Sequence, residues 1–245
     1  MTLRNSATFI SGYSQGLGKA LALSLFNKTF VVGISRNKND EVPCKFEQLD
    51  ISNYKKVERE ISKYDFLGDV KLNVILCAGT LGVAGGLLDT DLSSWDDVIT
   101  TNFLGNLAVI KALLPQMISS QYGRIVFLSG GGAANAFPEF SAYSISKTAV
   151  VREVENIAVE LRDQIKDFSV IALAPGAMET DMLKQVRAAG VSPRTVVDIK
   201  EPVEFITKFL SMDAEKAKSL SGKFIHVRDD LNSDYTNKWL LRRSE

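Results

Sequence analysis

A short strand, a glycine-rich turn and a helix follow one another near the start of the chain. Residues 7–10 are an apolar run typical of a buried strand, and apolar residues at helical spacing begin at Leu17. Between them, Gly12, Gly16 and Gly18 give the spacing G-x-x-x-G-x-G. Glycines in such a turn let the backbone approach a pyrophosphate at the N-terminus of the helix. The stretch therefore predicts a dinucleotide site, with a plain tight turn as the alternative.

The alternation of strands and helices continues along the chain. Further strands are predicted at 30–34, 44–49, 72–76, 124–128, 169–173 and 224–227, with helices at 52–64, 95–119, 141–162 and 202–211. This pattern predicts an α/β fold with a doubly wound parallel sheet and helices on both faces, in one domain covering residues 1–245. Only residues 37–43 separate the second and third strands, which is too short for a helical crossover.

The composition favours an ordinary globular protein. Lys and Arg together number 29, as do Asp and Glu, so the formal net charge is zero. Neither nucleic acid nor a membrane surface is indicated as a partner. The two cysteines, Cys44 and Cys77, are interpreted as reduced thiols. We find no metal-ligand pattern, signal-peptide pattern or apolar run of membrane-spanning length, and expect a cytoplasmic protein.

Tyr143 and Lys147 are four residues apart in the predicted helix 141–162, so their side chains share one face. A free tyrosine has a pKa near 10, and a nearby ammonium group favours the phenolate. Lowering the pKa by about three units takes about 4 kcal/mol. The tyrosine would then be a general acid and base near neutral pH. The alternative is an interfacial tyrosine beside a solvated lysine.

The residues after the next strands bear on the choice of cofactor. Arg36 follows the second strand, where an acidic residue would bind the ribose 2′-hydroxyl of NAD and an arginine accommodates the 2′-phosphate of NADP. We therefore favour NADP(H) over NAD(H), with a surface arginine as the alternative. Asp50 and Ile51 end the third strand, where the adenine would lie. Ala78 and Gly79 are small enough to admit the cofactor's ribose.

Taken in order, these motifs resemble the short-chain dehydrogenases and reductases with subunits of about this length. The resemblance covers residues 6 to 227. It rests on Gly12, Gly16, Gly18, Asp50, Ala78, Gly79, Asn102, Ser129, Tyr143, Lys147, Pro175, Gly176 and Thr180. It implies a Rossmann fold of seven strands in the order 3-2-1-4-5-6-7, with a nicotinamide cofactor. The implied reaction interconverts a carbonyl and an alcohol by hydride transfer.

The resemblance also implies roles for individual residues. Tyr143 would exchange a proton with the substrate oxygen, and Lys147 would lower its pKa and bind the nicotinamide ribose. Asn102 would support a proton relay through water, although a buried asparagine is more often structural. The implied cofactor contacts are Gly12, Ser14, Gln15, Gly16, Leu17, Gly18, Arg36, Asp50, Ile51, Ala78, Gly79, Tyr143, Lys147, Pro175, Gly176 and Thr180. A homodimer or homotetramer would form through the long helices after strands four and five.

The chain departs from the family pattern in four places. Residues 76–79 read Leu-Cys-Ala-Gly instead of Asn-Asn-Ala-Gly, and the helix between strands two and three is nearly absent. The usual Asp-Gly-Gly end is replaced at residues 228–230, and an extra tail continues to residue 245. The usual serine position, thirteen residues before Tyr143, is Gly130.

Ser129 precedes three glycines, which permit a positive φ and a bulge. We expect this freedom to turn Ser129 into the cleft, within ~3.5 Å of the Tyr143 hydroxyl or one water molecule away, so that it orients the substrate. The alternative is that Ser129 bonds to local backbone, and that another group or a water molecule orients the substrate.

Two functional classes therefore stay open. The favoured one is an NADP(H)-dependent oxidoreductase acting on a small carbonyl or alcohol, and its rival is a cofactor-binding regulatory or scaffold protein without turnover. A sugar epimerase or dehydratase is disfavoured, because there is no large C-terminal substrate domain. Residues 181–199 are predicted to form a flap over the substrate. The tail (residues 228–245) and the Ser-Gly-Gly-Gly loop resemble a subgroup linked to bacterial surface-sugar biosynthesis, which points to a sugar derivative as one substrate class.

Overall fold

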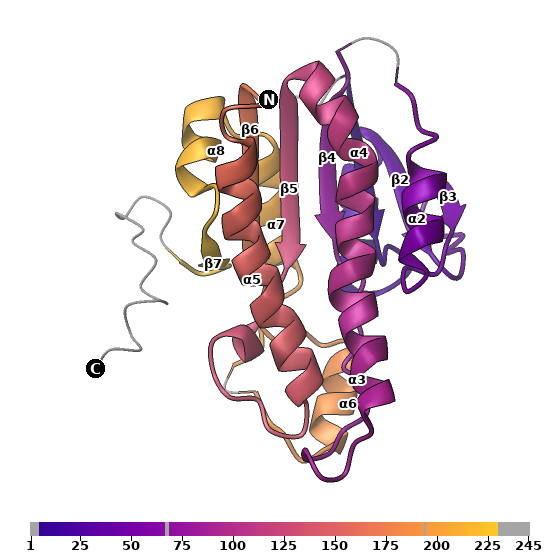
Figure 1. Cartoon of the computed structure of the whole chain (residues 1–245), viewed down its shortest axis with the longest axis vertical. Coiled ribbons are helices and arrows are strands. Elements are labelled where there is room, and N and C mark those ends of the chain that lie inside the picture. Colours follow the sequence, from indigo (N-terminus) through magenta and orange to yellow (C-terminus); the bar gives the residue numbers. More distant parts are fainter. Residues whose placement is uncertain (1–4, 67–68, 194, 230–245) are drawn as a thin grey trace.

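Seven parallel strands form a single sheet in this computed structural model, which describes residues 5–66, 69–193 and 195–229 (Figure 1). The strands are β1 (Ser6–Ser11), β2 (Phe30–Ser35), β3 (Lys45–Gln48), β4 (Lys71–Leu76), β5 (Tyr122–Leu128), β6 (Asp167–Ala174) and β7 (Phe224–His226). Their order is β3-β2-β1-β4-β5-β6-β7, and every neighbouring pair is parallel. The predicted Rossmann fold and strand order are confirmed.

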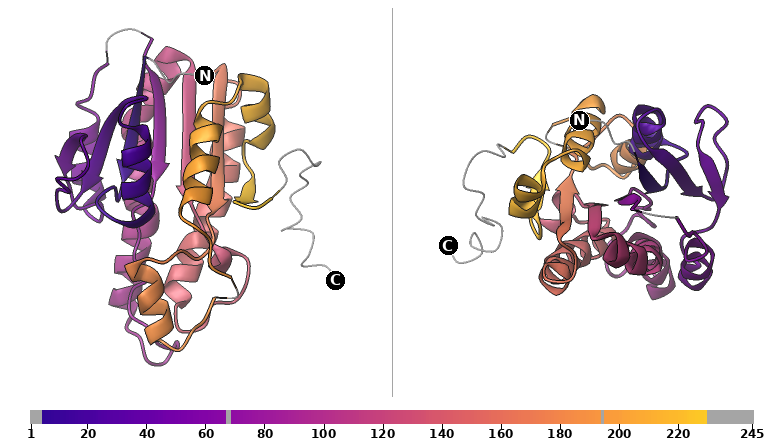
Figure 2. Two further views of the ribbon diagram at one scale, coloured as in Figure 1. Left: turned by 180° about the vertical axis from the view of Figure 1, so that it is seen from behind. Right: turned by 90° about the horizontal axis from the view of Figure 1, so that it is seen from above.

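Helices cover both faces of the sheet, as the view from above shows (Figure 2). One face packs against α2 (Tyr54–Ile61), α4 (Asn106–Ser120) and α5 (Ser141–Leu161), and the other against α1 (Gly16–Leu25), α7 (Lys200–Leu210) and α8 (Ala214–Leu220). Successive strand residues point to opposite faces, so Phe9 joins the first core and Ile10 the second. Complete burial of such a side chain contributes about 1.5–3 kcal/mol. Helix α8 was not predicted, because its short sequence is mostly polar.

The helix predicted at residues 95–119 is a longer, interrupted run. It consists of α3 (Leu92–Ile99), the π-helical turn η1 (Thr100–Gly105) and α4. By length and apolar composition alone this run could cross a membrane, but 44% of its most apolar window is buried. It packs along the sheet and against α2 and α5, which makes it a core helix of this fold (Figure 1).

The connection between β2 and β3 contains no helix, as predicted: residues 36–44 run directly between the strands. The fully buried ring of Tyr13 covers the sheet there, with its centroid 5.8 Å from that of Phe46. A Cβ added at Gly33 would come within 2.5 Å of this ring. The Tyr13 hydroxyl accepts a hydrogen bond from the Asn39 amide at 3.1 Å. Tyr13 thus replaces part of the missing helix, a role that the sequence analysis did not assign.

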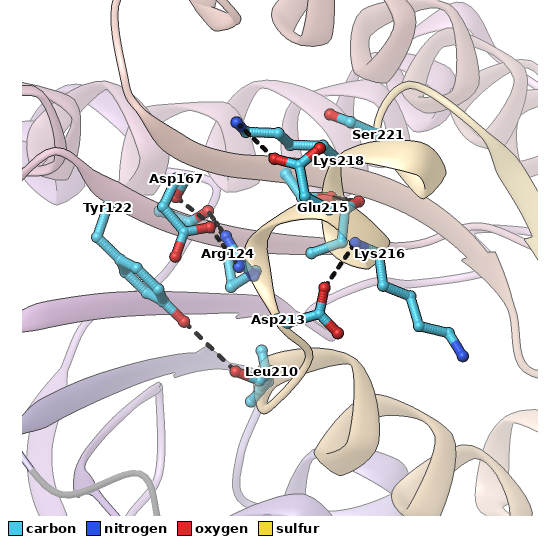
Figure 3. A network of polar contacts seen from close by, with 12 residues as sticks. Tyr122, Arg124, Asp167, Leu210, Asp213, Glu215, Lys216, Lys218 and Ser221 are labelled. Carbon is cyan, nitrogen blue, oxygen red and sulfur yellow. Dashed lines mark hydrogen bonds and ion pairs between the residues drawn. The ribbon is translucent and has the colours of Figure 1, made fainter. Parts of the chain in front are cut away.

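A buried cation lies at the amino ends of the strands (Figure 3). Arg124 is fully buried, and donates to the Asp167 carboxylate at 2.5 Å and to the Asp167 carbonyl oxygen at 3.0 Å. Its guanidinium carbon lies 4.8 Å from the centroid of the Tyr122 ring. The Tyr122 hydroxyl in turn donates to the carbonyl oxygen of Leu210 at 3.3 Å. These contacts join β5 and β6 to the end of α7.

Most of the predicted C-terminal tail lies outside the described residues. Of residues 228–245, the structure describes Arg228 and Asp229. Arg228 donates to both carboxylate oxygens of Glu201 in α7, at 2.8 and 2.7 Å. The only histidine, His226, lies in β7, and its Nδ1 accepts from the Arg228 amide at 3.2 Å. These contacts indicate a structural role for His226.

The Arg124–Asp167 pair generates a stability prediction. Asp167→Ala would leave the buried guanidinium without its carboxylate, and should lower the free energy of unfolding by roughly 3 kcal/mol, the lower end for breaking a buried pair because Asp167 is partly exposed. Urea denaturation would measure this loss. The matched control is Asp163→Ala, which removes an exposed ion pair with Arg162 and should change stability little. Equal losses in the two variants would contradict the prediction.

Candidate active site

The predicted site residues gather at the carboxyl ends of the central strands, whose arrows point downward in Figure 1. The glycine-rich turn follows β1, Ala78 and Gly79 follow β4, and Ser129 follows β5. Pro175 and Gly176 follow β6. The strand order reverses between β1 and β4, and ligands of open α/β sheets bind outside the carboxyl ends at such a point.

The glycines of the turn after β1 are required by close contacts. Gly12 has a φ of 69°, and an added Cβ would lie 2.8 Å from the backbone of Ala78. An added Cβ at Gly18 would lie 2.2 Å from the carbonyl oxygen of Gly12. Helix α1 then begins at Gly16 without a side-chain cap from Gln15. Its first amide groups can therefore bind a diphosphate, and the turn fits a dinucleotide.

A buried hydrogen-bond network joins this turn to the neighbouring loop and helix. Ser11 Oγ donates to Asn106 Oδ1 at 2.7 Å and accepts from the Ala78 amide at 3.1 Å. Asn106 Nδ2 donates to the carbonyl oxygens of Ala78, at 2.9 Å, and Asn102, at 3.0 Å. The network fixes the end of β1, the loop after β4 and the start of α4 relative to one another.

Asn102 lies in the π-helical turn and joins three segments through its side chain. Its Oδ1 accepts from the Thr80 amide at 2.7 Å, and its Nδ2 donates to the Thr80 carbonyl oxygen and to Ser146 Oγ, both at 2.9 Å. Ser146 Oγ donates to the carbonyl oxygen of Tyr143 at 2.7 Å. Both amide hydrogens of Asn102 are thus engaged by the protein, as the structural alternative expects.

The space above Gly79 is shared by Asn102 and Lys147. A Cβ added at Gly79 would lie 3.2 Å from Asn102 Oδ1 and 3.6 Å from Lys147 Nζ. Both polar atoms thus lie beside Gly79, where no side chain covers them. The absence of a side chain at residue 79 therefore fits a cofactor ribose.

Tyr143 and Lys147 share a face of α5, as their spacing predicts. Lys147 Nζ lies 5.5 Å from the centroid of the Tyr143 ring and donates to the carbonyl oxygen of Leu128 at 2.9 Å. Burial lowers the pKa of Lys147 to about 8 and raises the pKa of Tyr143 to about 12. The expected lowering of the Tyr143 pKa is therefore not found in the protein alone, because burial of the hydroxyl disfavours the phenolate.

Ser129 does not face Tyr143, and the prediction that it would is wrong. Its buried hydroxyl donates to the carbonyl oxygen of Lys147 at 3.0 Å. Its amide donates to the carbonyl oxygen of Leu173 at 2.8 Å and so extends the pairing of β5 with β6. An added Cβ at Gly130 would instead lie 3.6 Å from the Tyr143 hydroxyl oxygen. None of Gly130–Gly132 has a φ in the left-handed region, and Gly130 is extended. The expected bulge does not form, so a shift of one residue leaves Ser129 on the opposite face.

The predicted flap forms α6 (Asp181–Ala188), which is capped by Thr180 Oγ1 accepting from the Leu183 amide at 3.4 Å. Leu183 and Val186 pack with Leu81 and Phe140 in a buried apolar cluster. Partly buried residues that pack against this cluster are Phe137, Tyr143, Ala177, Met182, Ala189 and Val191. Tyr143 thus lies beside apolar side chains of the loops after β4, β5 and β6.

The predicted adenosine contacts lie at the rim of the sheet. Arg36 is exposed, and its carbonyl oxygen accepts from Gln48 Nε2 at 3.2 Å. Asp50 Oδ1 accepts from the amide and hydroxyl of Ser52, at 2.9 and 2.8 Å. The N-cap of α2 is Asn53, whose side chain accepts from the Lys56 amide. Ile51 is buried beside η1: an added Cβ at Gly105 would lie 2.2 Å from its carbonyl oxygen.

The sequence analysis missed several polar residues that hold the site together. They are Ser11, Thr80, Asn106 and Ser146. Asn106 lies four residues after Asn102, so a search for polar residues repeating on one helix face could have found it. Within the described residues, no group of three or more His, Cys, Asp or Glu side chains could hold a metal ion.

Comparison with known proteins identifies the family. The family described as short chain dehydrogenase matches residues 6–190. An uncharacterized oxidoreductase of Schizosaccharomyces pombe is 30% identical over 189 residues, which cover 73% of each chain. A 3-oxoacyl-(acyl-carrier-protein) reductase of Staphylococcus epidermidis is 26% identical over 248 residues, covering 91% of this chain and 97% of the relative. The chain belongs to the short-chain dehydrogenase/reductase family of NAD(P)-dependent oxidoreductases.

Solved structures share the fold. The ligand-free aldohexose dehydrogenase of Thermoplasma acidophilum superposes with a TM-score of 0.78 at 21% identity, covering 92% of this chain and 93% of that one. ElxO with NADP bound superposes with a TM-score of 0.75 at 24% identity, covering 91% and 96%. These similarities establish the architecture of the chain, and do not confirm the sugar-biosynthesis subgroup.

The lowered pKa of Lys147 predicts stability that rises with pH. The pKa of this lysine is about 8 in the folded protein and 10.5 in an unperturbed side chain. Between about pH 8 and pH 10 the unfolded state binds more protons, so the free energy of unfolding should rise, by at most about 1.4 kcal/mol per pH unit. The raised pKa of Tyr143 acts above about pH 10, where it makes stability fall.

Urea denaturation at three pH values within this window tests the expectation. Lys147→Met should reduce the rise of stability with pH, because the variant has no group at that position to titrate. Parallel dependences in the two proteins would show that burial does not lower the pKa of Lys147.

Proposed function

We propose that the protein is an NADP(H)-dependent oxidoreductase that interconverts a carbonyl and an alcohol, with Tyr143 as general acid and base. One observation carries the proposal. The Tyr143 hydroxyl faces the side-chain position of Gly130, at the carboxyl ends of the strands, while Lys147 and Asn102 share the space above Gly79 on the same side. A proton donor and a position without a side chain, beside Lys147 and Asn102, thus lie next to a turn that fits a diphosphate.

The chain's residues would hold the cofactor in three places. The turn from Gly12 to Gly18 would bind the diphosphate, Gly79 would make room for the nicotinamide ribose, and Arg36 would bind the 2′-phosphate. The nicotinamide supplies or accepts the hydride when bound. Thr180 faces the turn, since an added Cβ at Gly16 would lie 3.6 Å from its methyl group.

Tyr143 would donate its proton to the substrate oxygen during reduction. With its pKa raised by burial, the hydroxyl is protonated at neutral pH and ready to act as the acid. Lys147 is mostly protonated at pH 7, and its charge would stabilise the phenolate that forms. Asn102 would hold Lys147 and Tyr143 in place through Ser146 and the loop at Thr80. Ser129 has no role in this mechanism, because its hydroxyl donates to the backbone of Lys147.

The rival proposal is a cofactor-binding regulatory protein on the same fold. The missing side chain at Gly130 favours it, because the substrate oxygen would have one protein hydroxyl nearby instead of two. A screen of NADPH oxidation with carbonyl compounds separates the proposals. Turnover supports the enzyme, and dinucleotide binding without turnover supports the rival.

We further propose that the protein is a cytoplasmic homodimer or homotetramer that pairs through α4 and α5. Helix α5 exposes Ile145 and Val159, at 50% and 61% of their surface, which supports this face as an interface. Symmetric pairing is the commonest form of oligomer. The free cysteines Cys44 and Cys77 fit a reducing compartment. A monomer found by light scattering at micromolar concentration would contradict the assembly.

Tyr143→Phe tests the proton donor. The variant should keep its fold and bind NADPH as before, while kcat falls by at least ~10²-fold, because the proton for the substrate oxygen is lost. Steady-state kinetics with any substrate from the screen would measure the fall. Retained turnover would remove Tyr143 from the mechanism.

Arg36→Ala tests the cofactor choice. Loss of a charge-assisted contact to the 2′-phosphate should weaken NADPH binding by about 1.5–3 kcal/mol and leave NADH binding almost unchanged. Fluorescence titration with each cofactor measures both affinities. The matched control is Lys38→Ala, a nearby exposed cation that is already paired with Asp40. Equal losses for NADPH and NADH would reject the assignment of Arg36.

A further inference from the structure

The backbone conformation does not require glycine at residue 130. Its φ is 175° and its ψ is 178°, an extended conformation that any residue adopts. An added Cβ would make one ordinary contact, 3.6 Å from the Tyr143 hydroxyl oxygen. The contrast is with Gly12 and Gly18, where an added Cβ would lie 2.8 and 2.2 Å from backbone atoms. What Gly130 provides is therefore space beside the Tyr143 hydroxyl.

Apolar side chains pack beside Tyr143 and form an apolar wall there. The Phe137 ring has its centroid 6.1 Å from that of Tyr143 and 5.4 Å from that of Phe140. Phe140 packs in the buried cluster with Leu81 and Leu183, so side chains from the loops after β4, β5 and β6 contribute. These side chains offer no hydrogen bonds to a ligand.

The hydroxyl groups of the adjoining segments bond to backbone. Ser129 Oγ donates to Lys147 O at 3.0 Å, and Ser144 Oγ donates to Gly132 O at 2.6 Å. Ser146 Oγ donates to Tyr143 O at 2.7 Å. A substrate with many hydroxyl groups would lose its bonds to water here with few partners in exchange, whereas an apolar substituent would lose none.

We propose that the substrate is an apolar ketone with a branched or aromatic group at its carbonyl carbon, or the matching secondary alcohol. That group occupies the space left by Gly130 and lies against Phe137, while the carbonyl oxygen meets the Tyr143 hydroxyl. This inference rests on the proposed function and names its substrate class. In reduction, the carbonyl carbon would accept the hydride that bound NADPH supplies, and the carbonyl oxygen would accept the proton of Tyr143, whose phenolate would regain a proton from water. The products are the secondary alcohol and NADP⁺.

The experiment compares two alanine variants in the same loop. Gly130→Ala fills the space beside Tyr143. Gly131→Ala is the matched control, because an added Cβ there meets nothing within 4 Å and Gly131 is exposed. NADPH oxidation is followed with isobutyrophenone, 2-butanone and fructose, which represent a bulky apolar ketone, a small ketone and a keto sugar.

The wild-type protein should prefer isobutyrophenone to 2-butanone by at least about tenfold in kcat/KM, and use fructose least, since a few buried methylene groups are worth this factor. Gly130→Ala should lower that preference by at least about tenfold, and Gly131→Ala should keep it. A wild-type preference for fructose, or the same preference in all three proteins, would overturn the inference and leave the proposed function standing.

Ligand binding separates a failed inference from a failed function. Calorimetric titration of isobutyrophenone into the NADP⁺-loaded proteins needs no turnover. If no ketone is turned over but Gly130→Ala weakens this binding tenfold relative to Gly131→Ala, the proposed function fails and the ligand class stands. If neither turnover nor a binding difference is found, both fail.

A second variant keeps the inference testable if Gly130→Ala does not fold. Phe137→Gln places a polar side chain in the apolar wall, and circular dichroism would confirm that it folds. Binding of isobutyrophenone should weaken at least tenfold. Unchanged binding would show that this wall does not contact the substrate.

Discussion

The site depends on the hydrogen bonds that Ser11 and Asn106 make between β1, β4 and α4. Ser11 Oγ accepts a hydrogen bond from the Ala78 amide and donates one to Asn106 Oδ1. Asn106 Nδ2 in turn donates to the Ala78 carbonyl oxygen. Buried polar groups of this kind are costly when unpaired, and cooperative when every member is satisfied. Because the network is closed, the loop after β4 has one position relative to the glycine-rich turn. The position of Gly79 relative to this turn is fixed for the same reason.

The same loop carries the arrangement outward to α5. The Thr80 amide donates to Asn102 Oδ1, and the Thr80 carbonyl oxygen accepts from Asn102 Nδ2. Asn102 also donates to Ser146 Oγ, which donates to the carbonyl oxygen of Tyr143. The π-helical turn that holds Asn102 departs from regular helix geometry, as such turns often do at functional sites. The tyrosine is therefore positioned by a chain of bonds that starts at β1, as well as by the packing of its own helix.

Sequence patterns located the strands and most of the helices, but did not determine the directions of side chains within loops. Strand-like patterns located every strand that the structure describes, and the four-residue spacing placed Tyr143 and Lys147 on one face. The π-helical turn has no propensity signal, so Asn102 was assigned to an ordinary helix. The direction of the Ser129 side chain was predicted wrongly, because glycines permit a positive φ without requiring it. The hydrogen bond from the Ser129 amide to Leu173 in β6 keeps the backbone extended instead. The charge of Lys147 could be read from the sequence, whereas the burial that dominates the pKa of Tyr143 could not.

The short connection between β2 and β3 has a kinetic consequence. Tyr13 fills the space of the missing helix from beneath, but residues 36–44 leave the rim near Arg36 open to solvent. An adenosine moiety bound there would bury less apolar surface than one that is also covered by a helix. Differences in affinity between related complexes lie mostly in the dissociation rate. The residence time of the dinucleotide should therefore be short, and its departure should not be the slow step of the catalytic cycle.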